Sequence, residues 1–374
     1  MPQTNFYKTH HLPKPVAEHV PATTAELEDL VTGDHDGPPR IIVGGGEHLR
    51  EAAIGEQRFE AVRTEGCDGV LELDRESNLV RVEAGIRWAD LRERLREDGY
   101  SLDRYRPYAD TATVGGLLAR HHATPAHRFS GDLREGCVGL SAVSPTLGEY
   151  RYMRAPRKAS GPDLRHLFMG GEGLCGVILE ATLNVFKPFP GRRFEWSASS
   201  ASDAVRIMGE LAGRGVRPHW CHWKRSAGLF RAVIYAPTRL LESTAERLRA
   251  HYGEEFSVAN GDAVRELRRG LESNMPGRRS GEAAERTAEL TFSLAHLGPA
   301  IDALEGAEDI DIVDWSPHAA TAVVEFDEPL ASETQWPAAL DIRHVVGGPD
   351  LHWPEWAQVL KSRFDGDRRL AVGP

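Results

Sequence analysis

The stretch Ile-Ile-Val-Gly-Gly-Gly at residues 41–46 constrains the fold of this chain more than any other feature. Three β-forming residues run directly into three glycines, which predicts a buried strand that ends in a tight turn. Glycines allow positive φ angles and leave successive backbone N–H groups uncovered, so such a turn can hold an anion such as a phosphate. A tight turn without a ligand explains the same residues. The stretch therefore predicts either a phosphate-binding loop or a purely structural turn.

The common phosphate motifs do not match this turn. No Gly-Lys-Ser/Thr follows the glycines, and no G-x-G-x-x-G opens a helix. Two further glycine sets do occur in the first half of the chain, "TVGG" at 113–116 and "MGGEGLCGVIL" at 169–179. The former precedes an apolar helix start, where backbone donors and a helix N-terminus meet, and the latter precedes a strand. Three such sets in one domain favour a nucleotide site.

Composition sets the broad class. The chain has 374 residues, 41% of them hydrophobic, and a net charge of -11, which is typical of a globular protein with a sizeable core. An acidic chain without a basic block is a poor nucleic-acid binder, and no apolar run reaches the roughly 20 residues of a membrane helix. The four cysteines follow no metal spacing, so we expect them to be buried free thiols. No secretory pattern opens the sequence, so we expect a cytoplasmic location, peripheral to the inner membrane through partners. The four cysteines are Cys67, Cys137, Cys175 and Cys221.

Hydrophobic periodicity predicts the elements of the first half. We expect a capped helix at 22–31, a hairpin at 69–74 and 79–84, and a helix at 87–98. Two strands at 137–143 and 149–155 and a long strand at 176–186 complete this part. The Pro/Gly cluster at 188–191 predicts a domain boundary.

The second half has a different pattern. We expect strands at 193–198, 217–225 and 229–236, helices at 201–215, 243–253 and 298–304, and later strands at 288–294, 309–314 and 320–325. This order predicts an α+β domain with an antiparallel sheet and helices on one face, and a loop at 271–286. The predicted domains are 1–190, 191–345, and a C-terminal helix and tail at 346–374.

The glycine sets, in this order, resemble the PCMH-type FAD-binding domain of the vanillyl-alcohol oxidase/p-cresol methylhydroxylase superfamily. "IIVGGG", "TVGG" and "GGEGLCGV" match its motifs, and the likeness extends from about residue 15 to 188. Within the superfamily the chain is most similar to the small flavin subunit of bacterial glycolate oxidase, whose end resembles "LKSRFDGDRRLAVGP". The resemblance implies an α+β fold, with two FAD-binding α+β subdomains and a smaller cap domain with an antiparallel sheet.

The resemblance also implies non-covalently bound FAD and a set of contacts. The residues implied are Gly44, Gly45, Gly46, Glu47 and His48 at the pyrophosphate; Thr113, Val114, Gly115 and Gly116 at the pyrophosphate and ring; Ser130, Gly131 and Asp132 near the flavin; and Gly173, Gly176, Val177 and Ile178 at the adenosine half. Several positions depart from the family pattern, namely Val43, Glu47, His121, His122 and Pro162. These departures are also compatible with a chain that keeps the fold and binds FAD weakly or not at all.

The implied activity is oxidation of a small 2-hydroxy acid such as glycolate by hydride transfer to flavin N5. No iron–sulfur cysteine pattern occurs, so we expect the electron carrier to be another subunit of an oxidase complex. A non-catalytic structural subunit and a stand-alone flavin alcohol oxidase are the alternatives. The catalytic base is not identified. In "RPHWCHWKR", strand alternation places His219 and Cys221 on one face and His222 and Lys224 on the other, which separates the potential metal ligands, and we expect no metal site.

Overall fold

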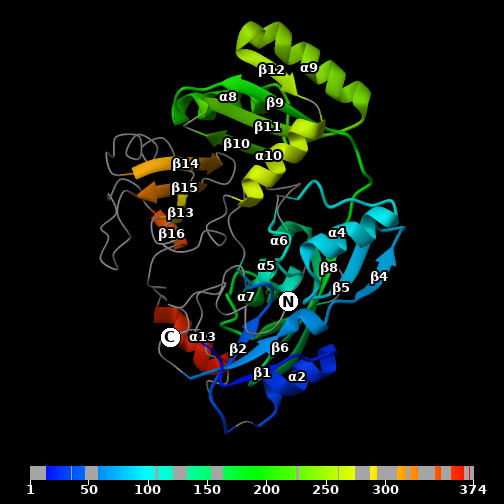
Figure 1. Ribbon diagram of the computed structural model, residues 1–374, viewed down its shortest axis with the longest axis vertical. Helices are drawn as coiled ribbons and strands as arrows, with labels where there is room; N and C mark the ends of the chain where they lie inside the picture. The colour runs from blue at the N-terminus through cyan, green and yellow to red at the C-terminus, as the bar shows by residue number, and fades with distance from the viewer. Residues whose placement is uncertain are drawn as a thin grey trace.

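The computed structural model describes residues 14–34, 36–46, 58–105, 108–120, 133–152, 163–224, 227–259, 261–273, 287–292, 310–316, 321–326, 342–346, 355–365 and 370. These residues form two bodies that lie one above the other (Figure 1). The lower body contains a three-stranded and a five-stranded sheet, and the upper body contains an eight-stranded sheet. The expected α+β fold class, with two α+β parts beside an α+β domain that has an antiparallel sheet, is confirmed.

The three-stranded sheet is parallel and has the order β1-β3-β2. Its strands are β1 (Ala17–His19), β2 (Arg40–Val43) and β3 (Glu60–Arg63). Helix α2 (Thr24–Thr32) confirms the predicted capped helix, because the Thr23 hydroxyl accepts a hydrogen bond from the Glu26 N–H at 3.2 Å. A 3₁₀ turn (Thr64–Gly66) follows β3. Strand β2 thus ends at the glycine triplet, as the sequence predicts.

The five-stranded sheet is antiparallel, with the order β4-β5-β8-β6-β7. Its strands are β4 (Val70–Asp74), β5 (Leu79–Glu83), β6 (Cys137–Ser144), β7 (Gly148–Tyr152) and β8 (Val177–Asn184). The accompanying helices are α4 (Trp88–Glu97), α5 (Val114–Arg120), α6 (Leu133–Gly136) and α7 (Arg165–Phe168). The predicted hairpin, the helix at 87–98 and the long strand are therefore present.

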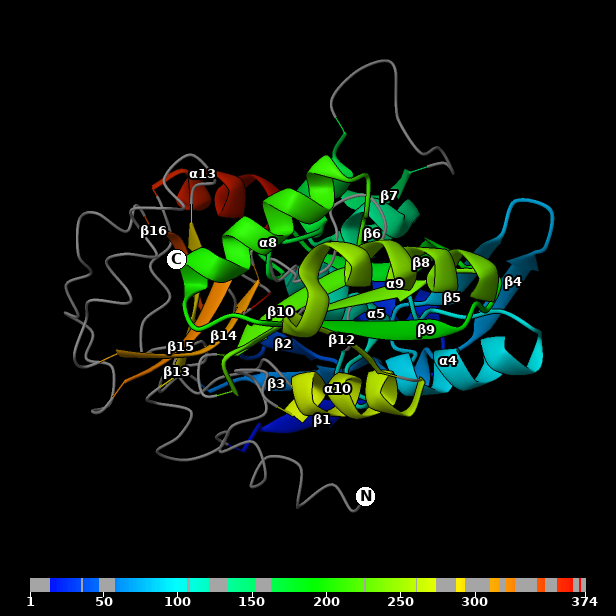
Figure 2. The same cartoon turned by 90° about the horizontal axis from the view of Figure 1, so that it is seen from above.

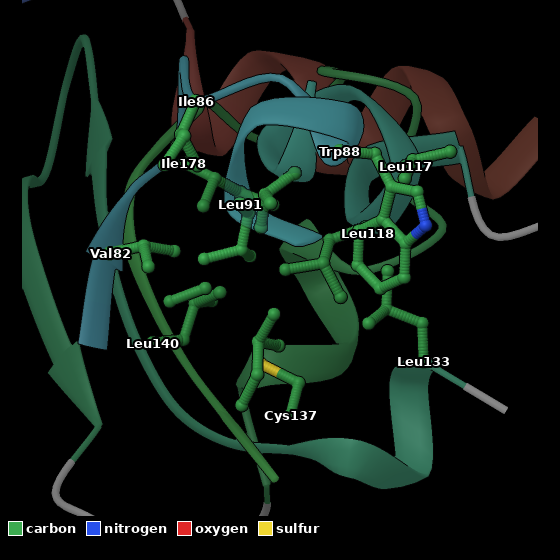
Figure 3. Packing of buried hydrophobic residues seen from close by; sticks show 14 of the residues in the cluster. Val82, Ile86, Trp88, Leu91, Leu117, Leu118, Leu133, Cys137, Leu140 and Ile178 are labelled. Carbon is green, nitrogen blue, oxygen red and sulfur yellow. The ribbon is translucent and has the colours of Figure 1, made fainter. Parts of the chain in front are cut away.

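One apolar core joins this sheet to its helices. Figure 3 shows Val82 and Leu140 of the sheet facing Leu91 of α4 and Leu118 of α5. Each of these side chains is at most 3% exposed. Burying a leucine or valine contributes roughly 1.5–3 kcal/mol, so this core fixes α5 on the sheet and with it the "TVGG" set.

The upper body has the strand order β12-β9-β11-β10-β14-β15-β13-β16, and its paired strands are antiparallel. The strands are β9 (Gly191–Ser197), β10 (Trp220–Lys224), β11 (Leu229–Tyr235), β12 (Phe256–Ala259), β13 (Thr287–Phe292), β14 (Ile310–Ser316), β15 (Thr321–Phe326) and β16 (Ile342–Val346). The helices are α8 (Ala201–Gly213), α9 (Thr238–Tyr252), a 3₁₀ turn (Gly253–Glu255) and α10 (Gly261–Ser273). The expected helix at 298–304 lies outside the described residues.

The helices of the upper body do not all cover one face, contrary to the prediction. Trp196 contacts Tyr252 at the end of α9, with ring centroids 5.8 Å apart, whereas Trp220 packs with residues of α10 on the opposite face. Helix α10 lies between this sheet and the lower body (Figure 1). The sequence analysis missed α10, β12 and β16. Helix α10 has two glycines and six charged residues within "GDAVRELRRGLES", which obscures its apolar stripe.

Among the described residues, two of the connections between the bodies can be followed. Strand β8 ends at Asn184 and β9 begins at Gly191, on either side of the Pro/Gly cluster. In addition, the buried Arg268 of α10 donates to the Asp103 carboxylate at 2.5 Å and to the Tyr105 carbonyl at 3.2 Å. The domain limits at 190 and 345 stay predictions.

The last helix, α13 (Glu355–Phe364), lies against the lower body (Figures 1 and 2). Among the described residues, no helix combines the length and the apolar character that crossing a bilayer would require.

Candidate cofactor site

A cavity opens in the lower body where β2, α5 and the loop before β8 meet. Its volume is about 110 Å³, and it is open to solvent on one side. The lining residues are Arg40, Ile42, Gly44, Thr64, Ala84, Thr113, Gly115, Gly116, Ala119, Glu172, Gly173, Gly176, Val177, Ile178 and Leu370. All three glycine sets therefore contribute to one cavity.

The first set is shaped by a close approach of two loops. A Cβ atom on Gly44 would lie 2.2 Å from Thr113 Oγ1, and one on Gly45 would lie 1.9 Å from the Thr111 carbonyl oxygen. Gly46 adopts a φ of 77°, which favours glycine. No described residue accepts a hydrogen bond from the amides of Gly45 and Gly46. The turn can therefore offer these N–H groups to an anion.

The second set uses its amides within the protein. The Val114 N–H donates to the Ile86 carbonyl at 3.0 Å and the Gly115 N–H to the Ala84 carbonyl at 2.7 Å. The Gly116 N–H donates to Thr113 Oγ1 at 3.3 Å. The expectation of bare amides is therefore wrong for this set. Its glycines instead let α5 approach the residues after β5, because a Cβ on Gly115 would lie 2.8 Å from that of Ala84.

The third set forms a loop that is tied to the end of α5. The Gly170 N–H donates to the Leu118 carbonyl and the Glu172 N–H to the Ala119 carbonyl, both at 2.9 Å. Glu172 has a φ of 49°, an uncommon value for a residue other than glycine, and lines the cavity. Gly176 has a φ of 145°, and a Cβ there would lie 2.1 Å from the Val143 carbonyl oxygen. This loop requires glycine for both conformation and space.

The structure brings together half of the predicted contact residues. Those that line the cavity are Gly44, Thr113, Gly115, Gly116, Gly173, Gly176, Val177 and Ile178. Gly45 and Gly46 belong to the turn that adjoins the cavity. The Val114 side chain is fully buried. The remaining predicted residues, Glu47, His48, Ser130, Gly131 and Asp132, lie outside the described residues, as do His121, His122 and Pro162. The assignment of each residue to a part of FAD stays a prediction.

The sequence analysis missed seven lining residues: Arg40, Ile42, Thr64, Ala84, Ala119, Glu172 and Leu370. Alternation along β2 offered a signal for Arg40 and Ile42, because Ile41 and Val43 are only 1% exposed and must face the core. Glu172 stands within the third glycine set. The only sequence signal for Leu370 was the resemblance of the C-terminal tail to the end of the glycolate oxidase flavin subunit.

The cysteines are free and buried, as expected. Burial raises the pKa of Cys67 and of Cys175 to about 11 and that of Cys137 to about 12. Burial also raises the pKa of Cys221. These thiols stay protonated near neutral pH and do not act as nucleophiles. No group of potential metal ligands occurs among the described residues.

One face of the upper sheet carries charged residues beside an apolar cluster. Trp220 packs with Val264 of α10, and alternation along β10 places His222 and Lys224 on the same face as Trp220. His222 is 4% exposed and lies directly opposite Arg231 of β11. Arg231 donates to Glu195 at 2.8 Å. Helix α10 packs on this face, and its Arg268 contacts the lower body, so the face lies on the side of the lower body (Figure 1).

The donors and walls of the cavity fit a flavin nucleotide. The amides of Gly45 and Gly46 suit a diphosphate, and Ile42, Val177 and Ile178 supply apolar surface for a ring system. A strongly basic pocket is not required, because backbone N–H groups carry the partial positive charge.

Comparison with known proteins agrees with this geometry. The family described as an FAD binding domain matches residues 15–151. The chain is 28% identical over 151 residues to an uncharacterised FAD-linked oxidoreductase, YgcU, of Escherichia coli K12, which covers 40% of this chain and 31% of that protein. It is 35% identical over 164 residues to the mitochondrial L-galactono-1,4-lactone dehydrogenase of Brassica oleracea, covering 44% and 26%.

Two further likenesses extend beyond this domain. A mitochondrial D-lactate dehydrogenase (cytochrome) of Saccharomyces cerevisiae is 28% identical over 225 residues, covering 56% of this chain and 37% of that protein. A solved structure of alkyldihydroxyacetonephosphate synthase matches with a TM-score of 0.68 at 18% identity, covering 95% of this chain and 76% of that chain. The matches thus span about a third of the curated relatives' lengths, and the structural likeness shows the fold.

Proposed function

We propose that this chain, which carries a PCMH-type FAD-binding domain, is an FAD-dependent oxidoreductase that acts on the CH–OH group of a small 2-hydroxy acid such as glycolate. The observation that carries the proposal is the convergence of three distant glycine sets on one cavity. Glycine at these positions serves close backbone contacts and positive φ angles, and the resulting turn leaves amides for a diphosphate.

The cofactor has a defined place in this proposal. When bound, FAD supplies the chemistry, since its flavin accepts a hydride. The amides of Gly45 and Gly46 hold the diphosphate, and Thr113 fixes the start of α5 through its hydrogen bond from Gly116. Apolar lining residues such as Ile42 and Ile178 exclude water from the cavity. These residues bind and orient, and they do not transfer protons.

The charged face of the upper sheet supplies the remaining groups. We propose His222 as the base that accepts the proton of the substrate hydroxyl, since a neutral imidazole has a ring nitrogen that can accept a proton. Lys224 lies two residues further along the same face and is half-buried, which suits an ammonium that binds a substrate carboxylate. The position of this face on the side of the lower body supports both roles. The lactate dehydrogenase among the similar proteins is consistent with a 2-hydroxy acid.

Electron transfer onward needs a partner in this proposal. The four cysteines are separated in the sequence, and each is buried as a free thiol. An iron–sulfur carrier would require several cysteine thiolates at one place. We therefore propose a separate iron–sulfur subunit of a cytoplasmic oxidase complex as the acceptor.

The proposal is tested with the purified full-length chain. We expect the visible absorbance spectrum of a flavoprotein, release of FAD on acid treatment, and bleaching of the flavin by 2-hydroxy acids under anaerobic conditions. His222→Asn should retain FAD and lose bleaching by at least roughly 100-fold in rate, the usual contribution of a general base. Lys224→Met should raise the substrate concentration required and alter the maximal rate less.

Two results would contradict the proposal. A colourless protein that does not take up added FAD would exclude flavin chemistry and favour the structural-subunit alternative. Bleaching by simple alcohols at the same rate as by 2-hydroxy acids would refute the substrate assignment alone.

A further inference from the structure

The C-terminal segment ends its helix in a buried ion pair. Lys361 Nζ lies 2.8 Å from Asp365 Oδ2, and the two side chains are only 5% and 0% exposed. Both partners also bind the backbone of Leu370, because the Leu370 N–H donates to Asp365 Oδ2 at 3.0 Å and Lys361 Nζ donates to the Leu370 carbonyl at 2.9 Å. The pair therefore fixes the position of one residue, Leu370. We call Lys361, Asp365 and Leu370 the C-terminal clasp.

Leu370 is a wall of the cofactor cavity. It is 3% exposed, forms a parallel bridge with Arg40 at the start of β2, and lines the cavity together with that arginine. Its side chain belongs to the same apolar cluster as Val177, which lines the cavity at the start of β8. A residue near the end of the chain thus completes a site built otherwise from the first half.

The helix that carries the clasp is itself anchored beside the third glycine set. The Phe364 carbonyl accepts hydrogen bonds from the Ser144 hydroxyl at 2.5 Å and from the Thr146 N–H at 3.1 Å. The Phe364 ring meets Phe168 of α7 edge-on, with centroids 6.3 Å apart. Because α7 leads directly into the glycine loop, α13 and that loop share one support.

A gain in the free energy of folding does not explain well why the Lys361–Asp365 ion pair is buried. Taking two charges out of water costs several kcal/mol each, and a well-packed apolar pair of similar volume is often at least as stable. The gain from such a pair is that it specifies one geometry through its hydrogen bonds. Here that geometry places the Leu370 side chain against the cavity.

We propose that the C-terminal clasp forms the adenosine-side wall of the FAD site, with Leu370 in contact with the adenosine half and Asp365 as the residue that positions it. This inference rests on the proposed use of the cavity for FAD. It follows from the shared cluster with Val177, a residue that the family resemblance implies for the adenosine half. FMN lacks the adenosine half, so the clasp should contribute little to binding FMN.

The test compares four full-length proteins: the wild type, Leu370→Ala, Asp365→Asn, and Val359→Ala as the control. Val359 lies on the same helix and is 61% exposed. Dissociation constants of the apo-proteins for FAD and for FMN are measured by flavin fluorescence, and thermal melting shows that each variant is folded at the assay temperature. We expect Leu370→Ala and Asp365→Asn to weaken FAD binding about tenfold, or roughly 1.4 kcal/mol, without a matching change for FMN. Val359→Ala should bind FAD like the wild type.

Each other outcome overturns the inference. Folded Leu370→Ala and Asp365→Asn with wild-type affinity for FAD would exclude the clasp from the site. An equal loss of FAD and FMN would show that the clasp does not act on the adenosine half. A wild-type protein that binds no FAD would refute the proposed function and the clasp together, which separates that failure from the failure of the clasp alone.

Discussion

Replacing Gly176 with alanine tests why the third glycine set requires glycine. Gly176 has a φ of 145°, and its Cβ would lie 2.1 Å from the Val143 carbonyl oxygen and 3.1 Å from the Ser144 Cα atom. Both neighbours are backbone atoms of β6, the strand next to β8. Because backbone cannot rotate away as a side chain can, the substitution must shift a central strand. Gly173 is a matched control in the same loop, with a φ of 82° and no atom within 4 Å of its Cβ position.

The two substitutions share one cost and differ in another. An alanine at positive φ costs about 1–2 kcal/mol, which applies to both positions. At position 176 the clash adds about 1–3 kcal/mol, the usual cost of overpacking a filled interior. We therefore expect a loss of about 1–2 kcal/mol for Gly173→Ala and of roughly 2–5 kcal/mol for Gly176→Ala. A difference of about 2 kcal/mol corresponds to roughly 4–8 °C in melting temperature for a domain of 150–250 residues.

The assay is denaturant unfolding of the apo-proteins, followed by FAD titration of the folded variants. Gly176→Ala should lose both stability and FAD affinity, since the loop moves away from the cavity with β6. Gly173→Ala should lose less of each. Equal stability losses for the two variants would refute the clash as the reason for glycine at position 176. A Gly176→Ala protein with normal FAD affinity would refute the link between this loop and the cofactor.

Three further predictions concern other parts of the molecule. Arg268→Met and Asp103→Asn should each lower the stability of the contact between the two bodies by about 1 kcal/mol. The loss is this small because Asp103 is 41% exposed and solvent screens its charge. The double variant should lose less than the sum of the two single losses. Additive losses would show that the two side chains are not coupled. Hydrogen bonds from Arg165 lower the pKa of Asp163, so its contribution to stability is full above the unfolded pKa of about 3.9 and is lost as the pH falls through the lower folded value. Asp163→Asn should therefore make the free energy of unfolding depend less on pH between these two pKa values. An unchanged pH dependence would contradict this prediction. The four thiols should react with a thiol reagent at pH 8 only as fast as the chain opens, because burial raises the pKa of each; rapid reaction of the folded protein would contradict their placement.

Local patterns were sufficient for most elements of the lower body. The alternation in 69–74 and 79–84 predicted β4 and β5, and the apolar spacing of Trp88, Leu91 and Leu95 predicted α4. These signals depend on residues within one or two turns or one strand, so they survive in the sequence alone. Helix α10 was missed because its charged residues and glycines outnumber the few apolar residues of its buried face.

The candidate site was predictable in position but less so in its chemistry. The glycine sets indicated the cavity, yet nothing near Gly115 in the sequence shows that its N–H is taken by the Ala84 carbonyl. That bond depends on how α5 docks against the residues after β5. Leu370 was harder still, because it reaches the cavity through a bridge to Arg40, 330 residues earlier in the chain. Contacts of such separation leave no local pattern.

The departure at Val43 shows how the structure changes the interpretation of a sequence difference. Val43 is one of the departures from the family pattern that raised the alternative of weak or absent FAD binding. Val43 is 1% exposed and follows Ile41 on the core side of β2, whereas Arg40 and Ile42 face the cavity. Because alternate residues of a strand point to opposite faces, the side chain at position 43 is directed into the core. Valine suits that environment, so packing alone accounts for this departure; on the cavity side of β2, Arg40 is already paired with Glu60 and donates to the Leu30 carbonyl.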